Sequence, residues 1–175
     1  WGARNAGATI VAGFDMLRLA AETFRFNFPE ARCVEGPIES LDTKTLRREF
    51  GSIDLILASP ECTNHTHAKG ARPRDERSKE TAFQVVRFAE AFEPRHVVIE
   101  NVVGMRRWQR YPELMSSLRS LGYHAAEYVI DAAELGVPQS RRRLIILCDR
   151  EREPKLRLRA RPRRTAGEIL DETEE

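Results

Sequence analysis

The sequence has few cysteines and no long apolar run. Its 175 residues contain three widely spaced cysteines, Cys33, Cys62 and Cys148, and no Cys-x-x-Cys pair. The cysteines therefore indicate neither a zinc site nor a disulfide framework. No apolar stretch is long enough to span a bilayer or to resemble a signal peptide. We expect a soluble protein of the cytoplasm or nucleoid, with buried and unreactive thiols at Cys33 and Cys148.

The net charge of +2 is small, but the charges are unevenly placed. Arginines and lysines crowd residues 141–164, and residues 168–175 are acidic. A basic patch beside a catalytic face suits phosphate contacts, which position a nucleic acid without reading its sequence. For residues 150–164 a solvated linker is an equal alternative, and the alternation Lys-Leu-Arg-Leu-Arg also fits an edge strand.

Apolar runs alternate with helical stretches along the whole chain, without an internal repeat. This pattern predicts an α/β fold with a mostly parallel sheet and helices on both faces. Strands are expected at residues 8–15, 31–35, 53–58, 96–101, 124–130 and 143–149. Helices are expected at residues 17–27, 41–49, 78–92 and 111–121.

A possible nucleophile, an acid, two arginines and two side-chain amides stand next to three of the expected strands. They are Cys62 after residues 53–58, Glu100 and Asn101 at the end of residues 96–101, and Gln139, Arg141 and Arg143 where the last strand begins. Taken singly, each has a structural explanation as a buried thiol, a helix cap or a solvated face. Open α/β sheets bind ligands at the carboxyl ends of their strands, so the joint placement favours one site.

These residue types suit methylation of a pyrimidine at C5, a carbon that is too weak a nucleophile to attack a methyl donor unaided. A Cys62 thiolate that adds to C6 would convert the ring into an enamine-like nucleophile at C5. Glu100 would protonate or hydrogen-bond N3, and Arg143 would hold O2 as negative charge develops there. Each residue type thus has one task in a single reaction.

At these positions the chain resembles the C5-cytosine-specific DNA methyltransferases. That family has a Pro-Cys nucleophile loop, a Glu-Asn-Val acid motif and a Gln-x-Arg-x-Arg motif. Here they read Pro60-Glu61-Cys62, Glu100-Asn101-Val102 and Gln139-Ser140-Arg141-Arg142-Arg143, in the family's order. The resemblance implies a Rossmann-like catalytic domain at residues 1–150. Residues 151–175 would then be a basic and then acidic segment leading toward a target-recognition region.

The resemblance also implies S-adenosyl-L-methionine as the cofactor, held by Asp15, Ile38 and Pro60. Asp15 would bind the ribose, as acids at strand ends do in Rossmann-like sheets, and an N-cap is its alternative role. Ile38 would pack on the adenine. The family's usual Gly-Asp-Ile reads Gly36-Pro37-Ile38 here, and Pro37 cannot contact the adenine amino group.

Double-stranded DNA with a flipped-out cytosine is the implied partner of a monomeric enzyme. The polar segment 63–77 would close over the base, with Lys69, Arg72 and Arg74 gripping phosphates; a surface loop is the alternative. Asn101 and Gln139 would support the loops by hydrogen bonds. His65 and His67 lack further ligands at zinc-like spacing, so no metal is expected.

The chain departs from the family pattern around Cys62, where Glu61 precedes and Thr63 follows the cysteine in place of the usual proline and glutamine. The carboxylate of Glu61 disfavours ionisation of the neighbouring thiol. A positive charge, from Arg141, Arg143 or the sulfonium group of the cofactor, would therefore have to stabilise the Cys62 thiolate. No match to the family's Phe-x-Gly-x-Gly-Gly loop or target-recognition region is found, so we expect the central part of a larger enzyme. Methylation of transfer RNA and a non-catalytic nucleic-acid-binding remnant are the alternatives.

Overall fold

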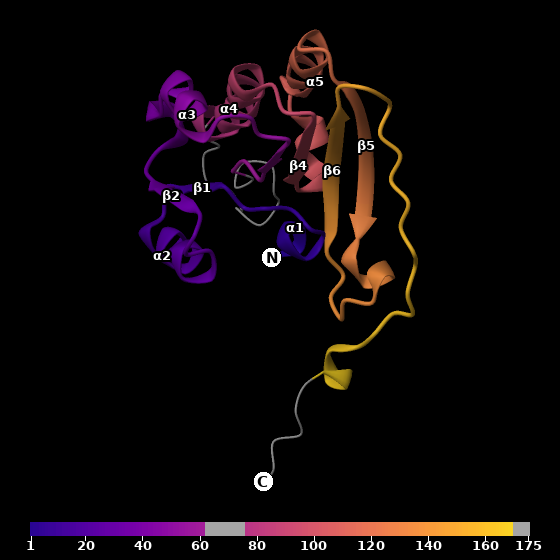
Figure 1. Cartoon of the computed structure of the whole chain (residues 1–175). Helices are drawn as coiled ribbons and strands as arrows, with labels where there is room; N and C mark the ends of the chain where they lie inside the picture. The colour runs from indigo at the N-terminus through magenta and orange to yellow at the C-terminus, as the bar shows by residue number, and fades with distance from the viewer. Residues whose placement is uncertain (62–75, 170–175) are drawn as a thin grey trace. The chain divides into compact units, whose positions relative to one another are not determined.

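The structure is a computed structural model that describes residues 1–61 and 76–169, without the side chains of residues 76–80. Two compact units make up the chain, Trp1–Ser52 and Ile53–Glu175 (Figure 1). Each unit combines a sheet with helices, and the α/β class is confirmed. None of the helices in the described part of the chain has the length and apolarity that a bilayer crossing requires.

The first unit is built on two parallel strands joined by a crossover helix. Its elements are α1 (Gly2–Asn5), β1 (Ala12–Asp15), α2 (Arg18–Asn27), β2 (Arg32–Glu35), the 3-10 turn η1 (Ile38–Ser40) and α3 (Thr43–Phe50). The strands pair in register from Ala12 with Arg32 to Asp15 with Glu35. Helix α2 packs closely on β1, because a Cβ atom on Gly13 would lie 2.5 Å from the Phe24 ring.

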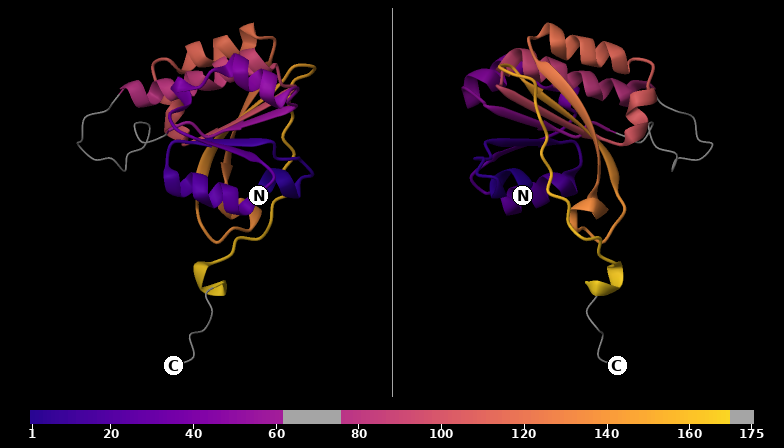
Figure 2. Two further views of the ribbon diagram at one scale, coloured as in Figure 1. Left: turned by 60° about the vertical axis from the view of Figure 1, so that its left-hand side comes forward. Right: turned by 90° about the vertical axis from the view of Figure 1, so that its right-hand side faces the viewer.

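The second unit holds a four-stranded mixed sheet in the order β3-β4-β6-β5. Its elements are β3 (Leu55–Ala58), α4 (Glu76–Phe92), β4 (His96–Asn101), η3 (Val103–Arg107), α5 (Tyr111–Ser120), β5 (His124–Asp131), η4 (Ala132–Leu135), β6 (Arg142–Asp149) and η5 (Ala166–Glu168). Figure 2 shows α4 and α5 together over one side of this sheet.

Strand β6 is the exception to the parallel arrangement expected from the sequence. Strands β3 and β4 are parallel, whereas β6 runs antiparallel to both of its neighbours, β4 and β5. A parallel connection needs a crossover of a dozen or more residues, usually a helix. Only residues 132–141, which include the short turn η4, separate β5 from β6. The connection is therefore too short for β6 to run parallel to β5.

The core of the second unit lies between the sheet and its two helices. Alternate residues of β4 and β6 face this core, and Val97, Ile99, Leu144 and Ile146 have no exposed surface. Cys148 lies on the same face, and burial raises the pKa of its thiol to about 12. The expected burial of Cys148 is thus confirmed, whereas Cys33 is only half-buried, with Sγ 3.5 Å from the carbonyl oxygen of Ala21.

Truncating Ile146 to alanine should lower the free energy of unfolding by about 2–5 kcal/mol, because it leaves a cavity in a fully buried layer. Val129→Ala in β5 is the matched control, since Val129 is 39% exposed, and it should cost much less. Urea unfolding of both variants measures the difference. Equal losses would contradict the assignment of β6 to the core.

Candidate active site

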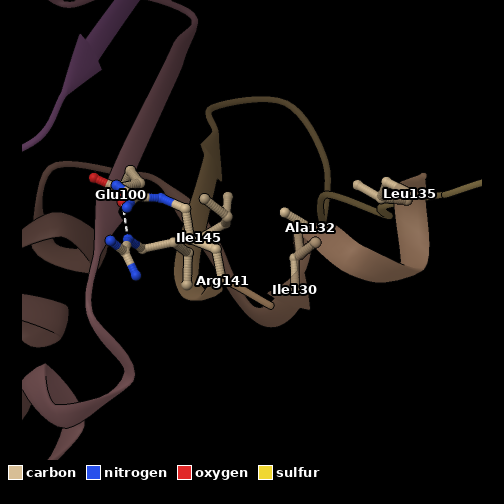
Figure 3. A pocket seen from close by; sticks show the side chains of 7 residues that line it. Glu100, Ile130, Ala132, Leu135, Arg141 and Ile145 are labelled. Carbon is tan, nitrogen blue, oxygen red and sulfur yellow. Dashed lines mark ion pairs between the residues drawn. The ribbon is translucent and has the colours of Figure 1, made fainter. Parts of the chain in front are cut away.

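An acid and an arginine predicted from the sequence meet at one edge of the four-stranded sheet. Because β6 is antiparallel to β4, its amino end lies beside the carboxyl end of β4, and the register pairs Glu100 with Ile145. Arg143 Nε donates to Glu100 Oε1 at 2.8 Å (Figure 3). The arginines thus reach this edge from the start of an antiparallel strand, whereas a β6 parallel to β4 would have carried them to the opposite edge of the sheet.

The ion pair borders a small cavity of about 280 Å³. Its walls are formed by Glu100, Arg141, Arg143, Ile130, Ala132, Leu135 and Ile145 (Figure 3). The side chains of Arg143 and Glu100 are 24% and 35% exposed, so both are partly sheltered from water. A charged pair beside an apolar wall can hold the polar edge of a planar ligand while its faces contact aliphatic groups.

Asn101 joins the segment after β3 to the end of β4. Its side chain is 1% exposed, and Nδ2 donates to the carbonyl oxygen of Pro60 at 3.0 Å. The amide of Val102 donates to Asn101 Oδ1 at 2.8 Å. The chain is therefore held at Pro60, two residues before Cys62. Cys62 itself lies outside the described residues, as do the three predicted phosphate-binding residues Lys69, Arg72 and Arg74.

Asp131, which the sequence analysis missed, organises the connection that leads to the arginines. Asp131 Oδ1 accepts hydrogen bonds from the amides of Ala133 at 3.1 Å and Arg141 at 2.9 Å. Oδ2 accepts from Ser140 Oγ at 3.1 Å. The hydrogen bond from the Ala133 amide is the largest of several that lower the pKa of Asp131. An aspartate directly before a short helical turn is a capping pattern, and that signal could have identified it.

The other residues of this connection differ in what they contact. Arg141 is exposed and lines the cavity, and its carbonyl oxygen accepts from the Ala132 amide at 3.1 Å. Gln139 is exposed, and its backbone amide donates to the Val137 carbonyl oxygen at 2.8 Å. Its predicted supporting role through the side chain stays a prediction.

Asp131→Asn should destabilise the protein at neutral pH and have little effect in acid. Folding lowers the pKa of Asp131. The ionised carboxylate therefore stabilises the folded state at any pH above the pKa of an aspartate in the unfolded chain, which is about 3.9. This stabilisation is lost as the pH falls through the lower pKa that Asp131 has in the folded protein. Urea unfolding of the wild type and the variant from pH 7 to pH 3, with exposed Asp54→Asn as the control, tests this. A difference that stayed constant over this range would contradict it.

In the first unit, Asp15 and Ile38 belong to the same edge of the β1–β2 sheet. Asp15 ends β1 and is exposed, and its Oδ1 accepts from the Leu17 amide at 2.8 Å. Leu17 is the N-cap of α2, so Asp15 holds the turn before the helix without capping it. The Gly36 amide donates to the Asp15 carbonyl oxygen at 3.0 Å, which places the start of Gly36-Pro37-Ile38 beside Asp15. Ile38 is half-buried.

Within the described residues no group of three or more histidines, cysteines or acids is placed to hold a metal ion. The side chains gathered at the two sheet edges are instead a carboxylate near a strand-to-helix turn and a carboxylate–guanidinium pair beside a cavity. The first suits hydroxyl groups of a sugar, and the second suits a polar heterocycle.

The chain matches the model of the C-5 cytosine-specific DNA methylase family over residues 1–172. It therefore belongs to this family, whose members are methyltransferases. The matched range extends beyond the motif-bearing residues 1–150 into the basic segment. The family model thus also covers the arginine-rich residues after β6.

Curated relatives include a type II methyltransferase and a tRNA methyltransferase. The type II methyltransferase M.AgeI of Thalassovita gelatinovora is 32% identical to this chain, and the match covers 83% of this chain and 35% of M.AgeI. The tRNA (cytosine(38)-C(5))-methyltransferase of Homo sapiens is 24% identical, and the match covers 84% of this chain and 38% of the human protein. The chain thus spans little more than a third of either relative.

Solved structures confirm the Rossmann-like methyltransferase fold. The Entamoeba histolytica methyltransferase EhMeth matches with a TM-score of 0.74 at 19% identity, covering 95% of this chain and 52% of that one. At this identity the likeness concerns the fold alone.

Proposed function

We propose that this chain forms part of an enzyme that transfers a methyl group from S-adenosyl-L-methionine to C5 of cytosine in double-stranded DNA. The single observation that carries the proposal is the ion pair between Glu100 and Arg143 beside the cavity. A carboxyl group and a guanidinium group side by side match the ring nitrogen N3 and the exocyclic oxygen O2, which lie on the same edge of the cytosine base. Family membership supports the same chemistry.

The chain's own residues would act as follows. The Cys62 thiolate adds to C6 of the ring, and Glu100 gives a proton or a hydrogen bond to N3 as electrons move toward C5. Arg143 stabilises the negative charge at O2. After C5 is methylated, loss of its proton to a base re-forms the C5–C6 double bond and releases Cys62.

The cofactor supplies the methyl group, and the first unit has groups that fit its nucleoside. Asp15 uses Oδ1 for the Leu17 amide and is exposed, so the carboxylate can also accept hydrogen bonds from ribose hydroxyls. Ile38 offers an aliphatic surface for the adenine ring. Pro37 has no polar side chain, so its side chain cannot accept a hydrogen bond from the adenine amino group.

DNA is the first candidate substrate because the matching family model describes C-5 cytosine-specific DNA methylases, and the type II methyltransferase M.AgeI is 32% identical to this chain. Transfer RNA is the second, because the 24% identical human relative is named for cytosine 38 of tRNA. Both substrates present the same cytosine ring to the site, so the Glu100–Arg143 pair does not distinguish them. Which of the two nucleic acids is methylated must therefore be measured.

The test is bisulfite sequencing of both DNA and small RNA from cells that express the complete reading frame. Cells carrying the empty vector are the control. We expect methylcytosine at a recurring DNA motif. Methylation confined to tRNA would replace DNA as the substrate, and no methylation by folded protein would overturn the proposal in favour of a non-catalytic remnant.

A further inference from the structure

Residues 154–163, here called the basic strap, run along the outer side of β5 (Figure 1). The Tyr128 hydroxyl in β5 donates to the carbonyl oxygen of Pro154 at 2.9 Å and accepts from the Leu156 amide at 3.1 Å. Farther along, the Arg161 amide donates to the Glu134 carbonyl oxygen at 2.9 Å. Two attachment points fix the strap, so it is neither a loose linker nor an added edge strand of the sheet.

The second attachment joins the strap to the connection that carries Arg141. Gly136, in this connection, has φ +84°, and a Cβ atom there would lie 3.3 Å from the Arg161 side chain. Residues Ala132 and Leu135 of the same connection line the cavity. The strap therefore ends against the loop that forms one wall of the candidate active site.

Cations recur at every second position of the strap. They are Lys155, Arg157, Arg159, Arg161 and Arg163, and all five are exposed. Side chains two residues apart in an extended chain point to the same side, at a spacing of about 6.6 Å. Among the described residues, only Arg163 of these five has an ion-pair partner, Glu134 at 3.8 Å. A row of uncompensated positive charge repels itself and favours an anionic partner.

We propose that the basic strap binds the phosphate backbone of duplex DNA next to the target cytosine. This inference rests on the proposed function, which places DNA at the neighbouring cavity. A polymer with regularly spaced negative charges matches a linear row of cations better than a single small anion does. Contacts of this kind orient the duplex and carry no sequence information. Because the backbone of the strap is already held in place, little conformational entropy should be lost when DNA binds.

The test compares two variants that each remove two positive charges. One is the strap variant Arg157→Gln/Arg159→Gln, and the control is Lys44→Gln/Arg119→Gln, which changes exposed helical residues. Binding of short duplexes to the protein made from the complete reading frame is measured over a range of salt concentrations. The logarithm of the binding constant falls with the logarithm of the salt concentration. The steepness of this fall should decrease by about 1.8 for the strap variant, at about 0.9 for each lost phosphate contact. The control should change it little.

Affinity should fall by a similar factor for duplexes of unrelated sequence. Lys155→Gln, measured in the same way, should give about half the change in slope and provides a second, milder variant. An unchanged slope, an equal change in the control, an effect confined to one sequence, or weakened binding of tRNA alone would each overturn the strap's role.

The readout is binding, so it separates the strap from the catalytic proposal. A protein with no methyl transfer but a strap-dependent slope would overturn the function and keep the strap as a DNA contact. A protein that methylates DNA with an unchanged slope would overturn the strap alone.

Discussion

Replacing Cys62 by alanine should abolish methyl transfer and leave nucleic-acid binding in place. The C5 carbon of cytosine attacks a methyl donor only after a nucleophile has added to C6, and alanine has no group that can add. Binding should persist because it depends mainly on phosphate contacts made elsewhere. Methyl transfer from a radiolabelled donor and duplex affinity measure the two properties separately.

Cys148→Ala is the matched control for this experiment. Burial raises the pKa of the Cys148 thiol to about 12, so at neutral pH it holds almost no thiolate and cannot be the nucleophile. The variant should keep its activity per folded molecule while losing some stability from its core position. Substantial turnover by Cys62→Ala, or by Cys62→Ser, would rule out the covalent route.

Glu100→Gln should lower the rate of methyl transfer by about 10²–10⁴, the range that a positioned general acid contributes. The amide keeps the shape of the side chain but cannot give a proton to N3, and it removes the charge partner of Arg143. Stability should change by less than about 1 kcal/mol, because both side chains of the ion pair are partly exposed. Single-turnover rates and urea unfolding measure the two effects.

Glu127→Gln provides the same chemical change at a residue that does not line the cavity. Glu127 Oε2 pairs with Arg106 Nε at 3.1 Å, and its side chain is 25% exposed, comparable with Glu100. This variant should retain the wild-type rate. If the two glutamine variants were equally slow, or equally active, Glu100 would have no special part in the reaction.

Much of the fold follows from local sequence patterns. Strand β4 occupies the predicted residues 96–101, and β5 and β6 each differ from prediction by one residue. Strand β1 is shorter than expected, beginning at Ala12 and not at residue 8. Its partner β2 has four residues, so only four residues of β1 can pair with it. The number of residues that a strand can pair depends on the length of its neighbouring strand, and an apolar run in the sequence does not reveal that length.

The site was less accessible to sequence reasoning because it depends on strand direction. Both Glu100 and Arg143 were candidates, but their contact requires β6 to run antiparallel to β4. The role of Asp131 depends on hydrogen bonds to residues nine and ten positions away. Alternation along an extended chain explains why Arg141 and Arg143 line the cavity while Arg142, between them, does not.

The short connection between β5 and β6 also bears on how the second unit folds. These strands are adjacent in sequence and pair over their whole lengths, from His124 with Asp149 to Asp131 with Arg142. Closing a short loop costs less chain entropy than bringing β4 to β6 across the intervening α5. The β5–β6 hairpin should therefore form early, and β4 should join it later. Arg143 would already be in its strand when Glu100 arrives, so we expect the ion pair to form late in folding.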